Sequence, residues 1–214
     1  MRLTLDGLIP VPLADRGGIT QSGLWTQRVE FDAGEYVFIQ APSGTGKTTL
    51  LHILYGLRRD YKGEVRWGSD AVAKLSSTSL AGLRTNAVSI IFQDMRLFPE
   101  LTAWENLEIK RCLTNTVPEA KVSEWMGRLG IAEKRDSLAS TLSYGEQQRL
   151  AIVRALLQPF EWLLMDEPFS HLDHANAGKA IELIEEVVAQ RKAGLLLADL
   201  DENKYFNYTQ TIKL

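Results

Sequence analysis

The chain has 214 residues, of which 45% are hydrophobic and 24% charged, and its net charge is −3. This length allows one substantial core but falls short of two full domains. The weakly acidic balance argues against non-specific nucleic-acid binding, which needs a strongly basic surface, so we expect no nucleic-acid partner. Cys112 is the only cysteine, which excludes an internal disulfide and a cysteine-based metal cluster.

The N-terminal part predicts β structure. Residues Arg2–Ile9, Leu24–Phe31 and Glu64–Trp67 show alternation with Gly and Asp breaks, which favours antiparallel strands. Pro10–Gly23 is the one long candidate for a flexible loop. Prolines interrupt the N-terminal stretch before a signal-peptide core could form, and no apolar run approaches the ~20 residues needed to cross a bilayer. A role at a membrane would therefore need another chain to supply the spanning part.

A glycine-rich loop lies between two apolar runs, Tyr36–Ile39 and Leu50–Leu54. It follows the G-x-x-x-x-G-K-[ST] pattern except that Ala41 stands at the first glycine position. Between a strand and a helix, such a loop turns backbone N–H groups toward a phosphate, and the helix dipole favours the anion. We therefore predict nucleoside triphosphate binding, with a loop that holds no ligand as the alternative. The predicted binding residues are Pro42, Ser43, Gly44, Thr45, Gly46, Lys47, Thr48 and Thr49, in which Lys47 reaches the β- and γ-phosphates and the Thr48 hydroxyl holds Mg²⁺.

Four short apolar runs predict an α/β fold with a mainly parallel sheet, because such runs suit strands buried on both faces. Between Pro99 and Pro159 the apolar spacing becomes helical, which predicts a helical subdomain, approximately residues 94–158, inserted into the core. We expect one domain over residues 1–214, with the antiparallel β subdomain at its N-terminal side. The predicted strands are Tyr36–Gln40, Val88–Phe92, Trp162–Met165 and Leu195–Ala198, and the predicted helices are Thr102–Leu113, Pro118–Leu129 and Gly145–Leu157.

Two carboxylates follow a buried strand in the run Trp162–Pro168. Ligands bind beyond the carboxyl ends of parallel strands, so these side chains lie in position to act on a bound triphosphate. Asp166 is placed to hold Mg²⁺, directly or through a water, and Glu167 to orient and polarise the water that attacks the γ-phosphate. An acidic turn after a buried strand is the alternative, and the phosphate loop elsewhere in the chain favours the functional interpretation.

A helix start is predicted within Leu142–Arg149. Ser143 and Glu146 have the spacing of a capping box, and the helix behind them runs until Pro159. The serine hydroxyl and the backbone of Gly145 at a helix N-terminus are also suited to a γ-phosphate. Because this helix is far along the chain from the phosphate loop, a second copy of the protein could supply it.

The order of these segments resembles the ATP-binding cassette (ABC) family, specifically the nucleotide-binding subunit of an ABC transporter. The resemblance extends from about Val29 to Asp201, and the signature segment Leu-Ser-Tyr-Gly-Glu is among its most specific marks. It implies a P-loop NTPase core, ATP and Mg²⁺ as cofactors, and ATP hydrolysis that powers a membrane transporter. It also implies a head-to-tail homodimer or paired cassette that sandwiches two ATP molecules. An integral membrane subunit is the implied partner, with the cassette cytoplasmic and peripheral on the inner face of the cell membrane.

The resemblance implies further residue roles. Gln93, after the strand Val88–Phe92, would contact Mg²⁺ and the attacking water, and the segment that follows would dock on a helix of the membrane subunit. Ser170–Asp173 matches the D-loop, which communicates across the dimer. With the residues above, the predicted catalytic set is Lys47, Gln93 and Glu167, the metal set is Thr48, Gln93 and Asp166, and the set acting in trans is Ser143, Gly145 and Glu146.

Four features depart from the family pattern. Ala41 must avoid a positive φ. The ring of Tyr144, which replaces the first of two signature glycines, must point away from the γ-phosphate, and Glu146 in place of glutamine is a smaller change. No aromatic residue stands at the expected distance before the phosphate loop to stack on adenine, since Trp25 lies too close to it. Asp199 ends the last core strand, where the family usually has a histidine that contacts the γ-phosphate. An ionised Asp repels phosphate, so we predict slow ATP turnover.

The main alternative is a non-hydrolysing, regulatory ATP-binding cassette, which the absent histidine suggests and Glu167 opposes. The three histidines lie elsewhere: His52 follows the phosphate loop, and His171 and His174 flank the D-loop, from which one could assist a neighbouring protomer. Three other classes fit the sequence less well. A DNA-repair ATPase needs a long coiled coil between the phosphate loop and the signature segment, for which this chain has no room. A translation factor of this family normally joins two cassettes in one chain, and a metabolite kinase would not explain the signature segment. Cargo and direction of transport belong to the partner subunits.

Overall fold

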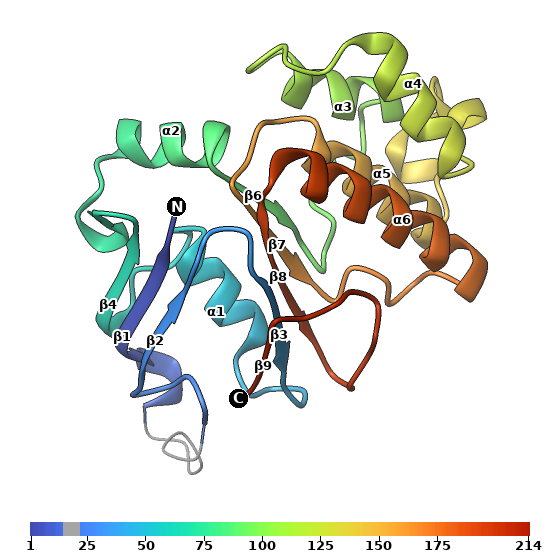
Figure 1. Cartoon of the computed structure of the whole chain (residues 1–214). Helices are drawn as coiled ribbons and strands as arrows, with labels where there is room; N and C mark the ends of the chain where they lie inside the picture. Colours follow the sequence, from blue (N-terminus) through green and yellow to red (C-terminus); the bar gives the residue numbers. More distant parts are fainter. Residues whose placement is uncertain (15–21) are drawn as a thin grey trace.

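The computed structural model describes residues 1–14 and 22–214, which form two β-sheets with helices around them (Figure 1). An antiparallel sheet has the strand order β2-β1-β4-β5, and a parallel sheet has the order β6-β7-β8-β3-β9. The predicted α/β class, with an antiparallel sheet on the N-terminal side of a parallel sheet, is confirmed. The first sheet contains β1 (Leu3–Pro10), β2 (Arg28–Phe31), β4 (Tyr61–Trp67) and β5 (Asp70–Ala71), and the second contains β3 (Tyr36–Gln40), β6 (Val88–Ile91), β7 (Trp162–Asp166), β8 (Gly194–Asp199) and β9 (Gln210–Lys213).

The antiparallel sheet differs from its prediction at the strand ends. β2 begins at Arg28, later than predicted, because Ser22 Oγ accepts two backbone hydrogen bonds at 3.0 Å and holds the preceding stretch in a turn. β4 begins earlier than predicted, at Tyr61. Within the predicted flexible loop, Val11–Leu13 forms a 3₁₀ turn, and the part from 15 to 21 lies outside the described residues.

Alternate residues of the parallel strands enter two hydrophobic cores, one on each face of the sheet. In β8, Leu195 and Leu197 belong to the core shared with α5 (Tyr144–Leu156) and α6 (His174–Arg191). Leu196 and Ala198 belong to the core shared with the antiparallel sheet and with α1 (Lys47–Leu54), which lies between the two sheets in Figure 1. Burial of both faces explains why these strands are continuous apolar runs.

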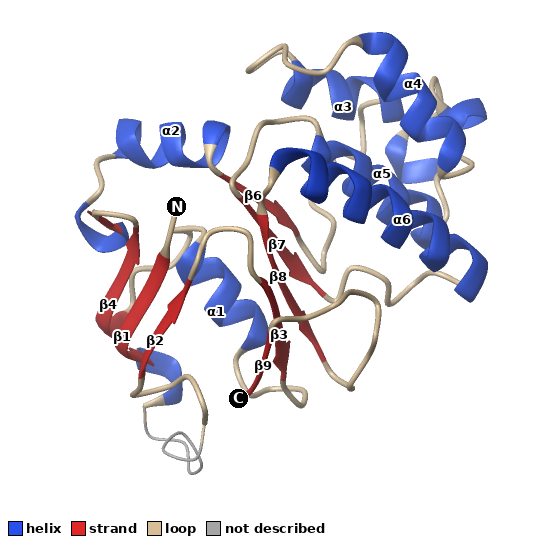
Figure 2. Ribbon diagram, in the orientation of Figure 1, coloured by secondary structure: helices blue, strands red, loops and turns tan. Residues whose placement is uncertain are grey.

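The helical stretch between the prolines contains α3 (Ala103–Arg111), α4 (Glu119–Arg128) and α5, each within two residues of its predicted ends. Both α3 and α5 begin with a capping box, formed by Thr102 and Ser143 respectively. α5 packs against both α3 and α4 through apolar side chains, and Figure 2 shows α5 next to the parallel strands with α3 and α4 farther from them. Helix α2 (Ser77–Asn86) was not predicted. Over the described ranges, no helix combines the length and apolarity needed to span a bilayer.

The carboxyl ends of the parallel strands meet at one edge of the sheet. In register, Gln40 of β3 pairs with Asp199 of β8, and Ala198 pairs with Asp166 of β7. The loops that leave these strands therefore start side by side, although they are far apart in the sequence. β9, which was not predicted, pairs with the outer side of β3 and places that strand inside the sheet.

Candidate functional site

The phosphate loop joins β3 to α1 as predicted. Ala41 is fully buried, its φ is not among the positive values, and its N–H donates to Asp199 O at 3.0 Å, so alanine fits the first glycine position. Gly46 has a φ of 112°, and a Cβ there would lie 2.6 Å from Leu13 Cδ1. Gly44 has a φ of 80°. The two glycines thus take backbone conformations that other residues adopt only with strain.

Lys47, the first residue of α1, has a side chain only 6% exposed. Its Nζ donates to Ala41 O at 2.8 Å and forms an ion pair with Glu167 Oε1 at 3.3 Å. Glu167 Oε2 accepts a hydrogen bond from Gln93 Nε2 at 3.3 Å, and Gln93 Oε1 accepts one from Thr48 Oγ1 at 3.5 Å. Four side chains predicted for the site, from α1 and the loops after β6 and β7, therefore form one polar network beside the phosphate loop.

Glu167 is held by its backbone in a left-handed conformation, with a φ of 46°. For a residue other than glycine this costs on the order of 1–3 kcal/mol and persists only where surrounding contacts enforce it. Glu167 N–H donates to Ala198 O at 3.0 Å, and Gln148 Nε2 donates to Glu167 O at 3.3 Å. Gln148 is 1% exposed and also accepts the His171 N–H at 2.9 Å. Gln148 therefore holds the backbone of Glu167. It follows the start of α5 by one turn, and the sequence interpretation assigned it no role.

Asp166 ends β7 with only 1% of its surface exposed. Burial, and to a smaller extent the charge of Glu167, raises the pKa of Asp166 to about 6. Its Oδ1 atom has no hydrogen-bond partner in the structure. A buried carboxylate oxygen without a partner, close to the hydroxyl of Thr48 and the amide oxygen of Gln93, is a donor set that suits a hard cation such as Mg²⁺.

Asp199 lies at the end of β8, next to the phosphate loop. Burial raises the pKa of its carboxyl, and the charge of Glu167 raises it further. Of the three histidines, His52 is in α1, where its ring packs against Phe92 at a centroid distance of 5.9 Å. His171 packs against the ring of Tyr144. No histidine of the described chain lines the hollow that contains Lys47 and Glu167.

The signature residues form the start of α5. Ser143 Oγ and Ser143 N–H both donate to Glu146 Oε2, at 2.9 and 2.8 Å, so the capping box uses this carboxylate. Tyr144 is 70% exposed, and its ring packs at 5.4 Å on His171. A Cβ on Gly145 would lie 3.1 Å from His171 O, which makes this a close backbone approach. The structure places these residues beside the D-loop.

Two hollows border the polar network. One, of about 270 Å³, contains Ser43, Gly44, Gly46, Lys47, Thr48, Thr49, Gln93 and Glu167, with Pro12 and Leu13 as further walls. The other, of about 560 Å³, lies between Thr48, Gln93 and Asp166 on one side and Tyr144 and Gln147 on the other. Ser143, Gly145 and Glu146 line neither hollow. Pro12 and Leu13 were missed by the sequence interpretation, because their closeness to the phosphate loop comes from the path of the chain after β1.

Comparison with known proteins agrees with this geometry. A model of the family described as "ABC transporter" matches residues 26–170. The chain belongs to this family. It is 32% identical over 202 residues to the lipoprotein-releasing system ATP-binding protein LolD of Novosphingobium aromaticivorans, which covers 93% of this chain and 90% of that relative. It is 34% identical over 172 residues to the macrolide export ATP-binding/permease protein MacB of Nitrosomonas europaea, covering 79% of this chain and 26% of that relative.

Solved ABC cassettes have the same fold. The dimeric structure of the bacterial ABC transporter cassette MJ0796 superposes with a TM-score of 0.80 at 25% identity and covers 93% of this chain and 88% of that one. A post-hydrolysis dimer of the same cassette, bound to ADP and Pi, gives a TM-score of 0.79. The chain is thus an ABC ATPase whose ATP-binding cassette energises a transporter. ABC cassettes bind ATP and ADP, dimerise and pair with membrane permease subunits.

Proposed function

We propose that this cassette binds MgATP, closes as a head-to-tail dimer, hydrolyses the nucleotide and transmits the motion to a membrane permease. The observation that carries the proposal is the network in which Glu167 contacts both Lys47 and Gln93 beside the phosphate loop. A carboxylate next to the loop lysine and an amide is suited to handling the attacking water. An acidic turn without a catalytic role would not require the left-handed backbone of Glu167.

Each residue of the network has a role in this proposal. The backbone N–H groups of the segment from Pro42 to Thr49 hold the phosphates, and Lys47 leaves Glu167 to pair with the β- and γ-phosphates. Glu167 then accepts a hydrogen bond from the water and takes its proton as the water attacks the γ-phosphorus. The bond from this phosphorus to the β–γ bridging oxygen breaks, and ADP and phosphate leave. Thr48, Gln93 and Asp166 would hold Mg²⁺, which supplies charge neutralisation at the β- and γ-phosphates.

Ser143, Gly145 and Glu146 would complete the site of a second protomer. The N-terminus of α5 provides backbone N–H groups and a positive dipole end for the γ-phosphate of the partner's ATP. Two observations support this: these residues line neither hollow of their own protomer, and a cassette 25% identical to this chain forms a dimer. Glu146 would act mainly by holding the Ser143 hydroxyl, because its carboxylate is already bonded there.

The membrane partner would contact the helical subdomain, residues 94–158, of a single cassette that spans 1–214. We place the cassette in the cytoplasm, peripheral on the inner face of the cell membrane. The similarity to LolD, which extends over nearly the whole of both chains, favours a permease of the lipoprotein-releasing type among the possible partners.

The decisive experiment is Glu167→Gln. Loss of the carboxylate should stop hydrolysis while leaving ATP binding intact, so the purified variant should elute as a dimer with ATP and as a monomer without it. Lys47→Ala should abolish ATP binding and the dimer in the same assay. Turnover by Glu167→Gln at the rate of the unaltered chain would overturn the role of Glu167. A chain that forms the ATP dimer but never hydrolyses would support a regulatory cassette instead.

Asp199 is the basis for proposing slow turnover. A carboxyl beside Glu167 places negative charge close to the proposed γ-phosphate position, and loss of a positioned transition-state contact typically costs ~10²-fold in rate. Asp199→His should therefore raise steady-state ATP turnover of the membrane-assembled complex by about tenfold or more. Asp201→His, two residues further on and exposed, is the matched control. A turnover of the unaltered complex well above ~1 s⁻¹ would contradict the proposal.

A further inference from the structure

Glu146 brings a negative charge to the start of α5, where the proposed function places the γ-phosphate of the partner's ATP. Its Oε2 atom accepts the hydroxyl and the N–H of Ser143, at 2.9 and 2.8 Å. The N–H and hydroxyl of Ser143, and to a smaller extent Lys134, hold the pKa of Glu146 below its usual value, so this carboxylate is ionised at neutral pH. With ATP bound, one helix N-terminus therefore has to stabilise two anions.

Lys134 supplies a positive charge at this point. Its Nζ forms an ion pair at 3.4 Å with Glu146 Oε1, the oxygen that Ser143 does not use. The pair is partly shielded from water, since the side chains of Lys134 and Glu146 are 35% and 19% exposed. Among the residues that the structure describes, no other basic side chain forms an ion pair with Glu146. The two carboxylate oxygens thus have separate partners, the helix start on one side and an ammonium on the other.

The backbone around Lys134 is held without the ion pair. Lys134 N–H donates to Ile131 O at 3.1 Å, and Lys134 O accepts the Ser137 N–H at 2.9 Å. The side chain of Ile131 is buried and anchors the turn Ala132–Lys134 that follows it. Replacing the side chain of Lys134 should therefore remove the charge and leave the turn in place.

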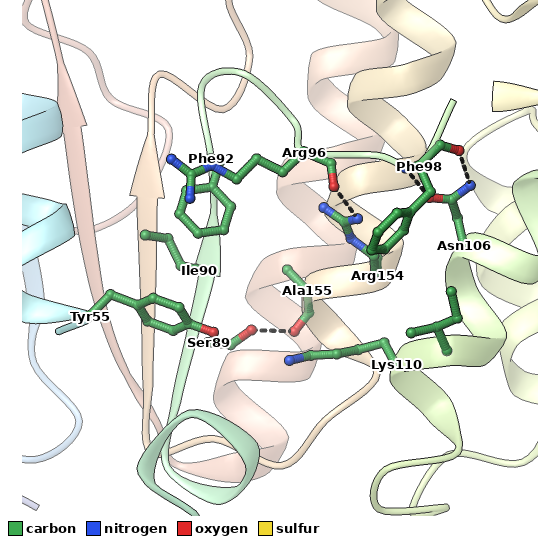
Figure 3. Close-up of a pocket in the computed structure, with 11 residues that line it drawn as sticks. Tyr55, Ser89, Ile90, Phe92, Arg96, Phe98, Asn106, Lys110, Arg154 and Ala155 are labelled. Carbon is green, nitrogen blue, oxygen red and sulfur yellow. Dashed lines mark hydrogen bonds between the residues drawn. The ribbon is translucent and has the colours of Figure 1, made fainter. Parts of the chain in front are cut away.

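Helix α5 is fixed to the rest of the cassette at its other end. Ser89 Oγ donates to Ala155 O at 2.6 Å, and Arg154 donates to Arg96 O at 2.6 Å, as the dashed lines in Figure 3 show. These bonds tie the last turn of α5 to β6 and to the loop after it. The direction of α5 is thus set by contacts far from Lys134, so loss of the ion pair should change the charge at the helix start rather than the orientation of the helix.

We propose that Lys134 is a positioning residue for the partner's ATP: its ammonium neutralises Glu146, so that the start of α5 can accept a γ-phosphate while the Glu146 carboxylate stays in the capping box. The inference rests on the proposed function, which supplies the second protomer and its nucleotide. Like charges brought together at an interface oppose association, so a nearby counter-charge determines whether the dimer closes.

The same ion pair allows the Ser143 hydroxyl to change its acceptor. In the structure this hydroxyl donates to Glu146, and it must leave that carboxylate in order to donate to a phosphate oxygen. Glu146 then keeps two partners, the Ser143 N–H and Lys134. Without Lys134 it would keep only the N–H and would face the phosphate with an uncompensated charge.

The stability of the ATP-bound dimer tests this proposal on the full chain. All proteins carry Glu167→Gln, so that ATP is not consumed, and the Kd of the dimer in MgATP is measured by analytical ultracentrifugation. Lys134→Met should raise this Kd at least about tenfold, and Lys134→Arg should retain it within about twofold. The affinity of the dilute monomer for a fluorescent ATP analogue should be the same in all of them. Lys121→Met is the matched control, because Lys121 is also 35% exposed and pairs with Glu124 at 2.9 Å on α4; it should leave the dimer unchanged.

Glu146→Gln provides the discriminating comparison, because it removes the charge that Lys134 neutralises. In this background Lys134→Met should change the Kd of the dimer by less than about twofold. With Glu146 present, ~1 M salt should reduce the effect of Lys134→Met to a similar level, since salt screens exposed charges. An equally large effect in the Glu146→Gln background would assign Lys134 to a direct contact with the nucleotide or the partner chain and overturn the proposal. A dimer that is insensitive to Lys134→Met would also overturn it.

Two further comparisons separate the remaining outcomes. Lys134→Gln, a second neutral variant, should weaken the dimer as much as Lys134→Met, and a loss of the dimer in Lys134→Arg as well would point to local packing and count against the proposal. If the Glu167→Gln chain with Lys134 intact forms no ATP dimer, the proposed function fails. A normal dimer that ignores the charge at position 134 overturns only the inference about Lys134.

Discussion

Asn106 is a buried polar residue that holds the segment leading into α3, and its removal should destabilise the protein. It is 1% exposed, and its side chain accepts one hydrogen bond, from Phe98 N–H, and donates to the carbonyls of Phe98, Leu101 and Thr102. Each of these carbonyls also accepts a backbone N–H: from Leu101, Ala139 and Asn106 itself. In Asn106→Ala, only the Phe98 N–H therefore loses its partner.

The expected loss of unfolding free energy follows from the hydrogen bonds that Asn106→Ala removes. Leaving the part-buried Phe98 N–H unsatisfied costs about 1–3 kcal/mol, and loss of the bonds from the side-chain amide to the three carbonyls adds about 1 kcal/mol. We expect Asn106→Ala to lower the free energy of unfolding by about 2–4 kcal/mol, measured by urea denaturation followed by tryptophan fluorescence. Asn86→Ala is the matched control, because Asn86 is exposed and bonds only within α2, so its effect should stay within about 0.5 kcal/mol. A loss below 1 kcal/mol in Asn106→Ala would refute the reasoning.

Three further predictions concern stability. Ser89→Ala should cost about 1–3 kcal/mol in urea denaturation, because Ser89 Oγ donates to Ala155 O at 2.6 Å and the residue four positions after Ala155 is a proline, which has no N–H to replace it; an unchanged midpoint would contradict this. Gly194→Ala should cost about 1–3 kcal/mol, since a Cβ would lie 2.8 Å from the ring of Trp162, and thermal unfolding would show a lowered midpoint. The pKa of Lys110 is about 8 in the folded protein and higher in the unfolded chain, which therefore binds more protons between these values. Stability relative to Lys110→Met should rise as pH increases from about 8 to 10, and a constant difference in urea midpoints would count against it.

Much of the fold and part of the site could be predicted from the sequence. The phosphate loop is a run of consecutive residues between a strand and a helix, so local chemistry is sufficient to define it. The buried strands were predicted from continuous apolar runs, and the starts of α3 and α5 from capping residues three positions apart. The predicted strand starts at Leu24 and Glu64 were wrong. The Ser22 hydroxyl holds the residues after it in a turn, and Tyr61 already pairs with Pro10 of β1.

The order of residues along the chain is enough to identify the chemical groups of the site: a loop lysine, two carboxylates after a strand, and a serine at a helix start. Which of these groups meet depends on how the strands pair, because the register of β3, β6, β7 and β8 brings Lys47, Gln93 and Glu167 to one edge of the sheet. Contacts between residues far apart in the chain depend on how the strands and helices pack, and the spacing of residues along the sequence does not determine the distances between them in the fold.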